Sequence, residues 1–347
     1  MKKILLFTFS FVVLLVTSCT NDDIVIEVND SVNEVNVSVS LSNFFSSYNY
    51  NDTYHGVSVT DDYRTFNSEF KRYIQTRTLI YDSNGFLVDS LLDYSTNTNT
   101  VTKIIKLSSG KYTAVSTLTF AMRSDKDNSF SSWWKLVDKD RLSTANLYIN
   151  SNYSKWSIMS YDSKEFTVTS GSTTTLSMNP SPIGALAYLF FQNFWCDSES
   201  NYPKIVDNGI RSLCVYTQNK ANSYKLDPNA AERYIYYDDQ GKDWWYYLSD
   251  KLVPTDFDSS WTFFETNLYD YFYVLSPKSR ITFGYSLEGS DTFTSYGEST
   301  QNVTSGQTYL AYWDYFKVGN PYFGIADNNH WNTYNSNARA NARQVLK

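Results

Sequence analysis

The chain has 347 residues, 18% of them aromatic, and a formal net charge of −7 at pH 7. An acidic chain without a basic patch repels phosphate backbones, which excludes nucleic acid as a partner. With two histidines, and without a phosphate-binding glycine loop or a Gly-x-Ser-x-Gly turn, the chain lacks the usual elements of histidine-based, nucleotide-dependent or serine-hydrolase chemistry. Abundant Tyr, Phe, Thr and Val with little Ala predict an all-β fold.

The first 18 residues have the layout of a secretory signal, with two lysines and then an apolar run over residues 4–16. The segment ends in Val16-Thr17-Ser18-Cys19, which resembles a bacterial lipobox. In a lipobox the cysteine thiol takes a diacylglyceryl group and the cysteine becomes the new N-terminus. A plain signal peptide would leave Cys19 unexplained, and a membrane-spanning helix needs roughly 20 apolar residues, more than this run offers. Cys19 is therefore the predicted lipidation site.

Residues 19–31 are predicted to form a tether between the lipid and the first folded unit, because the segment is short, acidic and polar. Residues 20–23, Thr-Asn-Asp-Asp, resemble the acidic tag that favours export of Bacteroidetes lipoproteins to the outer face of the outer membrane. The predicted location is therefore the outer membrane, with the chain lipid-anchored and facing the cell exterior.

Alternation of apolar and polar residues predicts the strands of a first domain over residues 32–179. The strongest local signal is Asn84-Gly85 between two strand-like runs, which predicts a β-hairpin. Residues 42–70 are predicted to be a long loop and residues 133–137 a short helix. The predicted strands are residues 35–41, 77–81, 86–92, 101–107, 111–120, 166–169 and 173–178.

Two prolines, Pro180 and Pro182, predict a boundary before a second domain over residues 180–326, which a polar tail over residues 327–347 follows. The second domain repeats the order of elements in the first, with residues 211–219, 275–283 and 302–310 corresponding to residues 77–84, 107–113 and 167–175. The alternative is that strand–turn–strand patterns look alike in any all-β protein. Short, regularly spaced strands favour two tandem antiparallel β-sandwiches.

Two cysteines, Cys196 and Cys214, remain after Cys19 is assigned to the lipid. They can form one disulfide in an oxidising compartment, or both can be buried thiols that act as small apolar residues. The strand-like surroundings of Cys214 favour the buried thiols.

Dense aromatic clusters are the one feature of the chain that suggests a binding surface. Exposed rings beside polar groups can stack on sugars or dock a partner protein. In the alternative, which alternation along the strands favours, the same rings are core and edge residues of the sandwiches. The candidate surface residues are Trp133, Trp134, Trp244, Trp245 and Trp313.

No catalytic, cofactor-binding or metal site is predicted. A glycosidase needs two carboxylates that face each other across a cleft. Adjacent acidic residues such as Asp238-Asp239 would point to opposite faces of a strand, so they do not predict this geometry.

Four features together resemble the Bacteroidetes fimbrillin-like superfamily: the lipobox signal, the strand–Asn84-Gly85–strand element, the Ser-Gly-Lys-Tyr-Thr strand start at residues 109–113, and the two-unit layout. That superfamily includes fimbrial shaft, tip and anchor subunits and many surface lipoproteins. The resemblance implies two transthyretin-like or immunoglobulin-like β-sandwiches in tandem, and it carries over no catalytic residues.

The resemblance also implies a mode of assembly, in which polymerising members lose an N-terminal strand by cleavage after an arginine and accept a donor strand from a neighbour. Arg64, Arg72 and Arg77 are the candidate cleavage positions here. An uncleaved, lipidated Cys19 would instead make the chain a base or anchor subunit.

The predicted function is that of a non-catalytic, lipid-anchored fimbrial anchor, accessory subunit or adhesin. Its predicted partners are the membrane, through the lipid on Cys19, and fimbrial subunits or surface glycans. The alternative is an outer-membrane glycan-binding lipoprotein of a polysaccharide-utilisation system.

Overall fold

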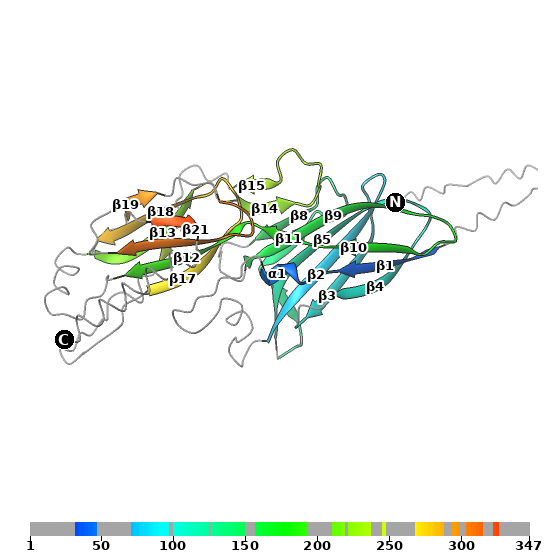
Figure 1. The fold of residues 1–347 in the computed structure, drawn as a ribbon, viewed down its shortest axis with the longest axis horizontal. Helices are drawn as coiled ribbons and strands as arrows, with labels where there is room; N and C mark the ends of the chain where they lie inside the picture. Colours follow the sequence, from blue (N-terminus) through cyan, green and yellow to red (C-terminus); the bar gives the residue numbers. More distant parts are fainter. Residues whose placement is uncertain are drawn as a thin grey trace, which may run out of the picture.

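The computed structural model describes a chain built almost entirely of strands, gathered into two units (Figure 1). Among the described residues the exception is a four-residue helix, α1 (Asn43–Ser46), so the all-β prediction is confirmed. The described residues are 32–46, 71–96, 100–124, 126–149, 157–192, 210–218, 221–236, 245–247, 268–287, 293–298, 303–314 and 322–325.

The N-terminal unit contains two sheets. The smaller sheet has the order β10-β1-β4, and in it β1 is parallel to β10 and antiparallel to β4. The larger sheet has the order β11-β9-β5-β2-β3, with β6 paired to β5. The strands are β1 (Asn33–Val39), β2 (Lys71–Asp82), β3 (Leu87–Ser95), β4 (Val101–Leu107), β5 (Gly110–Arg123), β6 (Phe130–Ser132), β9 (Met159–Val168), β10 (Thr174–Met178) and β11 (Ser181–Ile183).

The C-terminal unit also contains two sheets, with the orders β17-β12-β20-β21 and β16-β13-β18-β19. Its strands are β12 (Ala185–Gln192), β13 (Ile210–Gln218), β16 (Trp245–Tyr247), β17 (Leu268–Val274), β18 (Arg280–Leu287), β19 (Phe293–Glu298), β20 (Thr308–Asp314) and β21 (Tyr322–Ile325).

The two units repeat one topology. Strand β12 is parallel to β20 and antiparallel to β17, as β1 is to β10 and β4. The order β19-β18-β13-β16 likewise repeats β9-β5-β2-β3. The shared Val-Thr-Ser-Gly places Gly171 and Gly306 at φ 72° and 77°, in the turns before β10 and β20. The tandem sandwiches are confirmed, with the correction that each contains one parallel pair.

The predicted hairpin at Asn84-Gly85 joins β2 and β3, which pair antiparallel. Gly85 has φ 77°, a conformation that glycine adopts without strain. The Asp82 carboxylate accepts hydrogen bonds from the amides of Asn84 and Phe86, both at 2.9 Å, which holds the turn closed.

A third layer covers the larger N-terminal sheet, and sequence patterns did not predict it. Leu79, Ile80 and Tyr81 of β2 are all at most 2% exposed, which requires cover on both faces because successive side chains of a strand point to opposite faces. The third layer is a sheet of order β15-β14-β8-β7. It consists of β7 (Trp134–Val137), β8 (Asn146–Ile149), β14 (Ala221–Lys225) and β15 (Tyr234–Tyr236).

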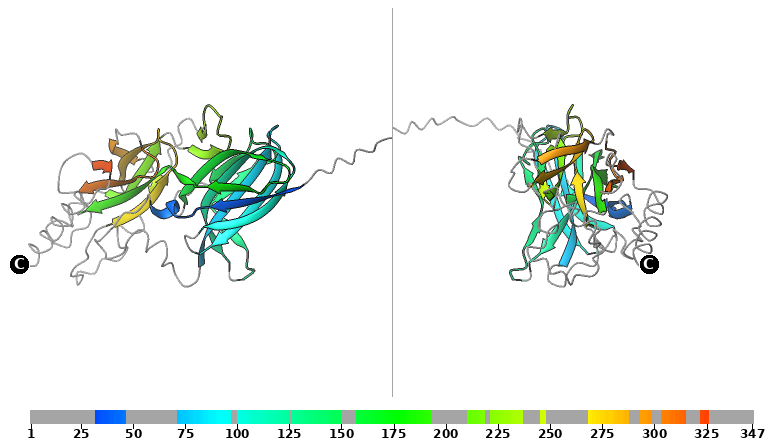
Figure 2. Two further views of the ribbon diagram at one scale, coloured as in Figure 1. Left: turned by 45° about the vertical axis from the view of Figure 1, so that its right-hand side comes forward. Right: turned by 90° about the vertical axis from the view of Figure 1, so that its left-hand side faces the viewer.

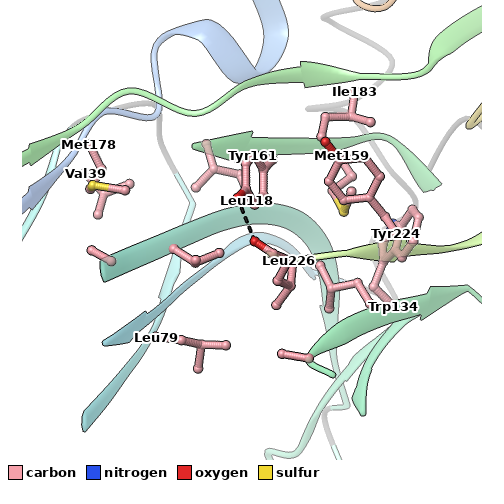
Figure 3. Close-up of a cluster of buried hydrophobic side chains, with 14 of the residues drawn as sticks. Val39, Leu79, Leu118, Trp134, Met159, Tyr161, Met178, Ile183, Tyr224 and Leu226 are labelled. Carbon is pink, nitrogen blue, oxygen red and sulfur yellow. Dashed lines mark hydrogen bonds between the residues drawn. The ribbon is translucent and has the colours of Figure 1, made fainter. Parts of the chain in front are cut away.

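The side chains of this third layer join the main core. Figure 3 shows Tyr161 on β9, whose hydroxyl donates to the carbonyl of Leu226 at 2.7 Å. Strand β7 also corrects the expected helix over residues 133–137. That segment pairs with β8 and alternates a buried Trp134 with an exposed Lys135, which is the period of a strand.

Strand pairing crosses the predicted division at residue 180 in two places. Residues 181–183 form β11, which pairs with β9 of the N-terminal sheet. Strand β14 of the later half pairs with β8 of the earlier half. The domain limits of residues 32–179 and 180–326 therefore stay a prediction, but the two halves share backbone hydrogen bonds and core.

Several predictions lie outside the described residues: the signal over residues 1–18, the tether with Cys19, the tail over residues 327–347, and Cys196. The expected loop over residues 42–70 is described up to Ser46, where it contains α1. Cys214 lies in β13, but its side chain is not among those described, so the disulfide alternatives stay open.

Candidate anchoring and assembly site

The first strand, β1, is the central strand of its sheet. Its register runs from Asn33 to Val39 against β4, and from Val35 to Val39 against β10. Its three valines, Val35, Val37 and Val39, are 0%, 1% and 2% exposed. Because both edges are paired and one face is buried, β1 is an integral part of the N-terminal core.

The start of β1, which follows the predicted tether, is fastened by one side chain. Asn33 is 6% exposed, and its amide nitrogen donates to the Ser109 hydroxyl at 3.3 Å. Its side-chain oxygen accepts from the backbone amide of Gly171 at 2.9 Å. Asn33 therefore bridges the turn between β4 and β5 and the turn between β9 and β10.

The C-terminal end of β1 is held by a backbone hydrogen bond and by packing of the residues that follow it. The Ser40 amide donates to the Met178 carbonyl at 2.9 Å. Beyond it, Leu41 and Phe44 are both 0% exposed, and the Phe44 ring lies 5.1 Å from the ring of Phe120. The chain is thus anchored in the core on the α1 side of the strand as well.

Two of the three candidate cleavage positions lie in a paired strand. Arg72 and Arg77 are both in β2, and Arg77 pairs with Leu92 on one side and with Thr117 on the other. A protease needs an accessible, unpaired backbone, so the folded unit protects Arg77. Arg64 lies outside the described residues.

The tryptophans predicted as a surface do not form one among the described side chains. Trp134 is 2% exposed, its indole N–H donates to the Ser157 carbonyl at 2.9 Å, and its ring packs edge-on against Tyr273. This corrects its expected place on a ligand surface and fits the core alternative. Trp133 is half-buried and packs against the core.

The side chains of the other three tryptophans, Trp244, Trp245 and Trp313, are not among those that the structure describes. Trp245 lies in β16 and Trp313 in β20, but neither side chain is described, and Trp244 lies outside the described residues. A surface made by these three stays a prediction.

The junction between the units is a second constrained place. Gly184, between β11 and β12, has φ 74°. Its amide donates to the Ser305 hydroxyl at 3.2 Å, and its carbonyl accepts from the Gly306 amide at 2.7 Å. The Tyr273 hydroxyl donates to the neighbouring carbonyl of Ile183. The segment that follows Pro180 and Pro182 is therefore a hydrogen-bonded junction, and the domain boundary predicted there stays a prediction.

A cation–aromatic cluster that sequence reasoning missed fastens the third layer. The guanidinium carbon of Arg233 lies 4.0 Å from the ring centre of Tyr161 on β9 and 4.4 Å from that of Tyr224 on β14. The three residues are far apart in sequence, and no local motif marks them. The cluster joins chain from both halves of the protein.

Replacing Arg233 with alanine is expected to lower the free energy of unfolding by about 2 kcal/mol, because the change removes a partly desolvated guanidinium and its cation–π contacts with two rings. The matched control is Arg141→Ala, since Arg141 lies 4.3 Å from the ring of Phe86, which is 43% exposed. That change should cost about 0.5 kcal/mol. Urea denaturation measures both, and equal losses would contradict the assigned role.

Alkaline pH is expected to destabilise this cluster. Burial raises the pKa of Tyr161 and of Tyr224 above the ordinary 10.0, although Arg233 acts in the opposite direction. Above pH 10 the unfolded chain releases protons that the folded chain keeps, so this stability is complete below pH 10 and falls as the pH rises. The loss is at most about 1.4 kcal/mol per pH unit for each tyrosine.

Urea midpoints measured from pH 9 to pH 11 test this expectation, with Tyr224→Phe as the variant that should weaken the decline. A flat profile, or an unchanged decline in the variant, would contradict the assignment to these buried phenols.

Two kinds of feature are absent from the described residues. They contain no group of three or more His, Cys, Asp or Glu side chains that could hold a metal ion. Within the same ranges, no helix has the length and apolar character needed to cross a membrane.

Comparison with known proteins gives a likeness in structure alone. No protein-family profile matches the chain, and no curated protein sequence matches it. A solved candidate polysaccharide-binding protein from Bacteroides thetaiotaomicron is 10% identical, with a TM-score of 0.46 over 86% of this chain and 99% of that one. The fimbrial anchor protein Mfa2 from Porphyromonas gingivalis is 8% identical, with a TM-score of 0.43 over 85% of this chain and 95% of that one.

A candidate adhesin from Bacteroides ovatus is 10% identical, with a TM-score of 0.41 over 81% of this chain and 87% of that one. These proteins are of the Bacteroidetes fimbrial and adhesin-like kind that the sequence resemblance names. With TM-scores below 0.5, these similarities do not establish what this chain does.

Proposed function

We propose that this chain is a non-catalytic, lipid-anchored cell-surface protein that serves as a fimbrial anchor or accessory subunit or as an adhesin. The observation that carries the proposal is the position of β1. The lipobox cysteine, Cys19, leads through a short tether directly into a strand that is paired on both sides and whose valines are buried. A lipid on Cys19 would thus be joined to the folded core without an intervening domain.

The same arrangement favours an anchor over a shaft subunit. A shaft subunit has to give up its first strand, whereas this chain's lipid would be lost with that strand. As long as β1 stays in its sheet, the lipid and the folded units remain one molecule. The partners proposed for the folded units are fimbrial subunits or surface glycans, and the proposed location is the exterior of the outer membrane.

Replacing Cys19 with alanine is expected to release nearly all of the protein from the membrane fraction, because the acyl chains are the proposed membrane attachment. The measurement is fractionation of the producing bacterium followed by immunoblotting. The matched control is Cys196→Ala, which removes a different thiol and should leave the protein in the membrane. Full membrane retention of a Cys19→Ala protein from which residues 1–18 have been removed would contradict the lipid anchor.

Glycan binding is the outcome that would change the proposed role. Soluble protein comprising residues 20–347 can be tested against a panel of polysaccharides, together with Trp244→Ala and Trp313→Ala. Binding that these substitutions abolish would replace the fimbrial proposal with a glycan-binding lipoprotein. An absence of binding, with capture of a fimbrial subunit from the same bacterium, would support the proposal.

A further inference from the structure

The direction of β1 sets how a pull on the tether would reach the fold. Strand β1 begins at the end of the N-terminal unit that faces away from the C-terminal unit and runs toward the junction (Figures 1 and 2). Its far end leads into α1, which contacts β11 beside the junction. A pull between the tether and the C-terminal unit would therefore act along the axis of β1.

Hydrogen bonds between strands lie across the strand axis, so a pull along that axis loads every pair together. Here those pairs run from Asn33 to Val39 on the β4 side and from Val35 to Val39 on the β10 side. If β1 slid by one residue, its buried valines would turn to the opposite face and the intervening polar residues would enter the core. Even a slip of one residue is thus unfavourable.

Both ends of the strand add resistance. At the N-terminal end of β1, the Asn33 side chain is hydrogen-bonded to Ser109, in the turn after β4, and to Gly171, in the turn before β10. A pull on the tether therefore loads these two hydrogen bonds first. At the C-terminal end of β1, the fully buried Leu41 and Phe44 would have to leave the core and move through the space between β4 and β10 before the strand could be pulled out.

We propose that β1 is the strand through which tension on an N-terminal tether passes, in shear, to β4 and β10. Asn33 is the latch, meaning the first side-chain contact that must break, and buried Phe44 then blocks the exit of the strand. The source of the tension rests on the proposed lipid anchor at Cys19. The mechanical geometry is a property of the fold, so the two ideas can fail separately.

The test is single-molecule force spectroscopy on the soluble chain over residues 20–347, with enzymatic attachment tags instead of thiol chemistry. In the shear geometry the handles are at residue 20 and at Lys126. Strand β5 begins at Gly110, three residues after the β4 partner of Asn33, so Lys126, an exposed position beyond the other end of β5, is far from Asn33 along the strand direction. In the peeling geometry they are at residue 20 and at Ser108, an exposed position beside the β4 residue that pairs with Asn33.

We expect the first rupture in the shear geometry at roughly twice the force of the peeling geometry, since the pairs share the load in one case and break in sequence in the other. In both geometries that rupture should release the chain between Asn33 and Lys71. Equal forces, or a first event in the shear geometry that releases a different stretch, would overturn the proposal.

Asn33→Ala is expected to lower the rupture force in the shear geometry, whereas Asn36→Ala makes the same change at a half-buried position of the same strand and should have little effect. Equal effects of the two substitutions would remove Asn33 as the latch. If Asn33→Ala does not fold, the comparison of the two pulling geometries in the unaltered chain still decides the main proposal. Retention of the unaltered protein in membranes reports on the lipid anchor alone.

Discussion

Replacing Val37 with aspartate is expected to unfold the N-terminal unit. Val37 is 1% exposed and lies in the middle of β1, where a carboxylate would be buried in the hydrophobic core. An unpaired buried charge costs several kcal/mol, and the lost valine adds to it, so the total is about 5 kcal/mol, a large part of the stability of an ordinary domain. The measurement is chemical denaturation followed by tryptophan fluorescence.

Ser38→Asp is the matched control, because Ser38 is the next residue of the same strand and is half-buried on the opposite face. The same charge there should cost about 0.5 kcal/mol. If both variants unfold alike, or neither does, then β1 does not present one buried face and one half-buried face, and the proposed role of β1 in anchoring is wrong.

Replacing Gly184 with alanine is expected to cost about 3 kcal/mol or more and to disturb the junction between the units. A Cβ atom at this position would lie 2.5 Å from the Val274 carbonyl oxygen and 2.7 Å from the Tyr273 hydroxyl. The carbonyl belongs to a paired strand, so it has little freedom to move. The left-handed backbone adds about 1 kcal/mol, and the steric overlap supplies the rest.

Gly171→Ala separates these two causes. Gly171 has a similar φ of 72°, but nothing lies within 4 Å of the atom that alanine would add. It should therefore lose about 1 kcal/mol through the backbone conformation alone. Denaturation of both variants of the chain over residues 20–347 measures the difference, and similar losses would show that the junction is more open than the structure indicates.

Strong local signals made several elements of the fold predictable. The alternation of Val35, Val37 and Val39 with polar residues predicted β1, and Asn84-Gly85 predicted the hairpin of β2 and β3. The repeated order of the two units was also visible, because strand and turn signals recur in both halves. These signals arise between residues close in sequence, where period and turn chemistry decide the structure.

The third layer and the junction could not be predicted in the same way. Strands β7 and β14 are four and five residues long, too short for a clear period, and they are brought together in space by β8. The cost of Gly184→Ala comes from Tyr273 and Val274, which are distant in sequence. The burial of Trp134 could not be predicted from the residues around it, because the groups that contact its side chain, Tyr273 and the carbonyl of Ser157, are distant in sequence.

The same limit applies to the candidate site. Four adjacent residues predict Cys19 as the lipidation site, and the alternation predicted β1. The role of Asn33 became apparent only when its two partners, Ser109 and Gly171, were placed beside it. The two turns that Asn33 connects are distant from it in sequence, so the residues next to Asn33 show no pattern that would predict these contacts.

In the proposed arrangement, Cys19 holds the chain to the membrane while β1 stays in its sheet. The most direct measurement is the N-terminal peptide of the protein purified from the membrane fraction of its native bacterium, identified by mass spectrometry. We expect a peptide that begins at Cys19, carries diacylglyceryl and acyl groups, and continues into Asn33 and the rest of β1. An unmodified Cys19, or a mature chain that begins after Arg64 or Arg72 and so lacks β1, would contradict it.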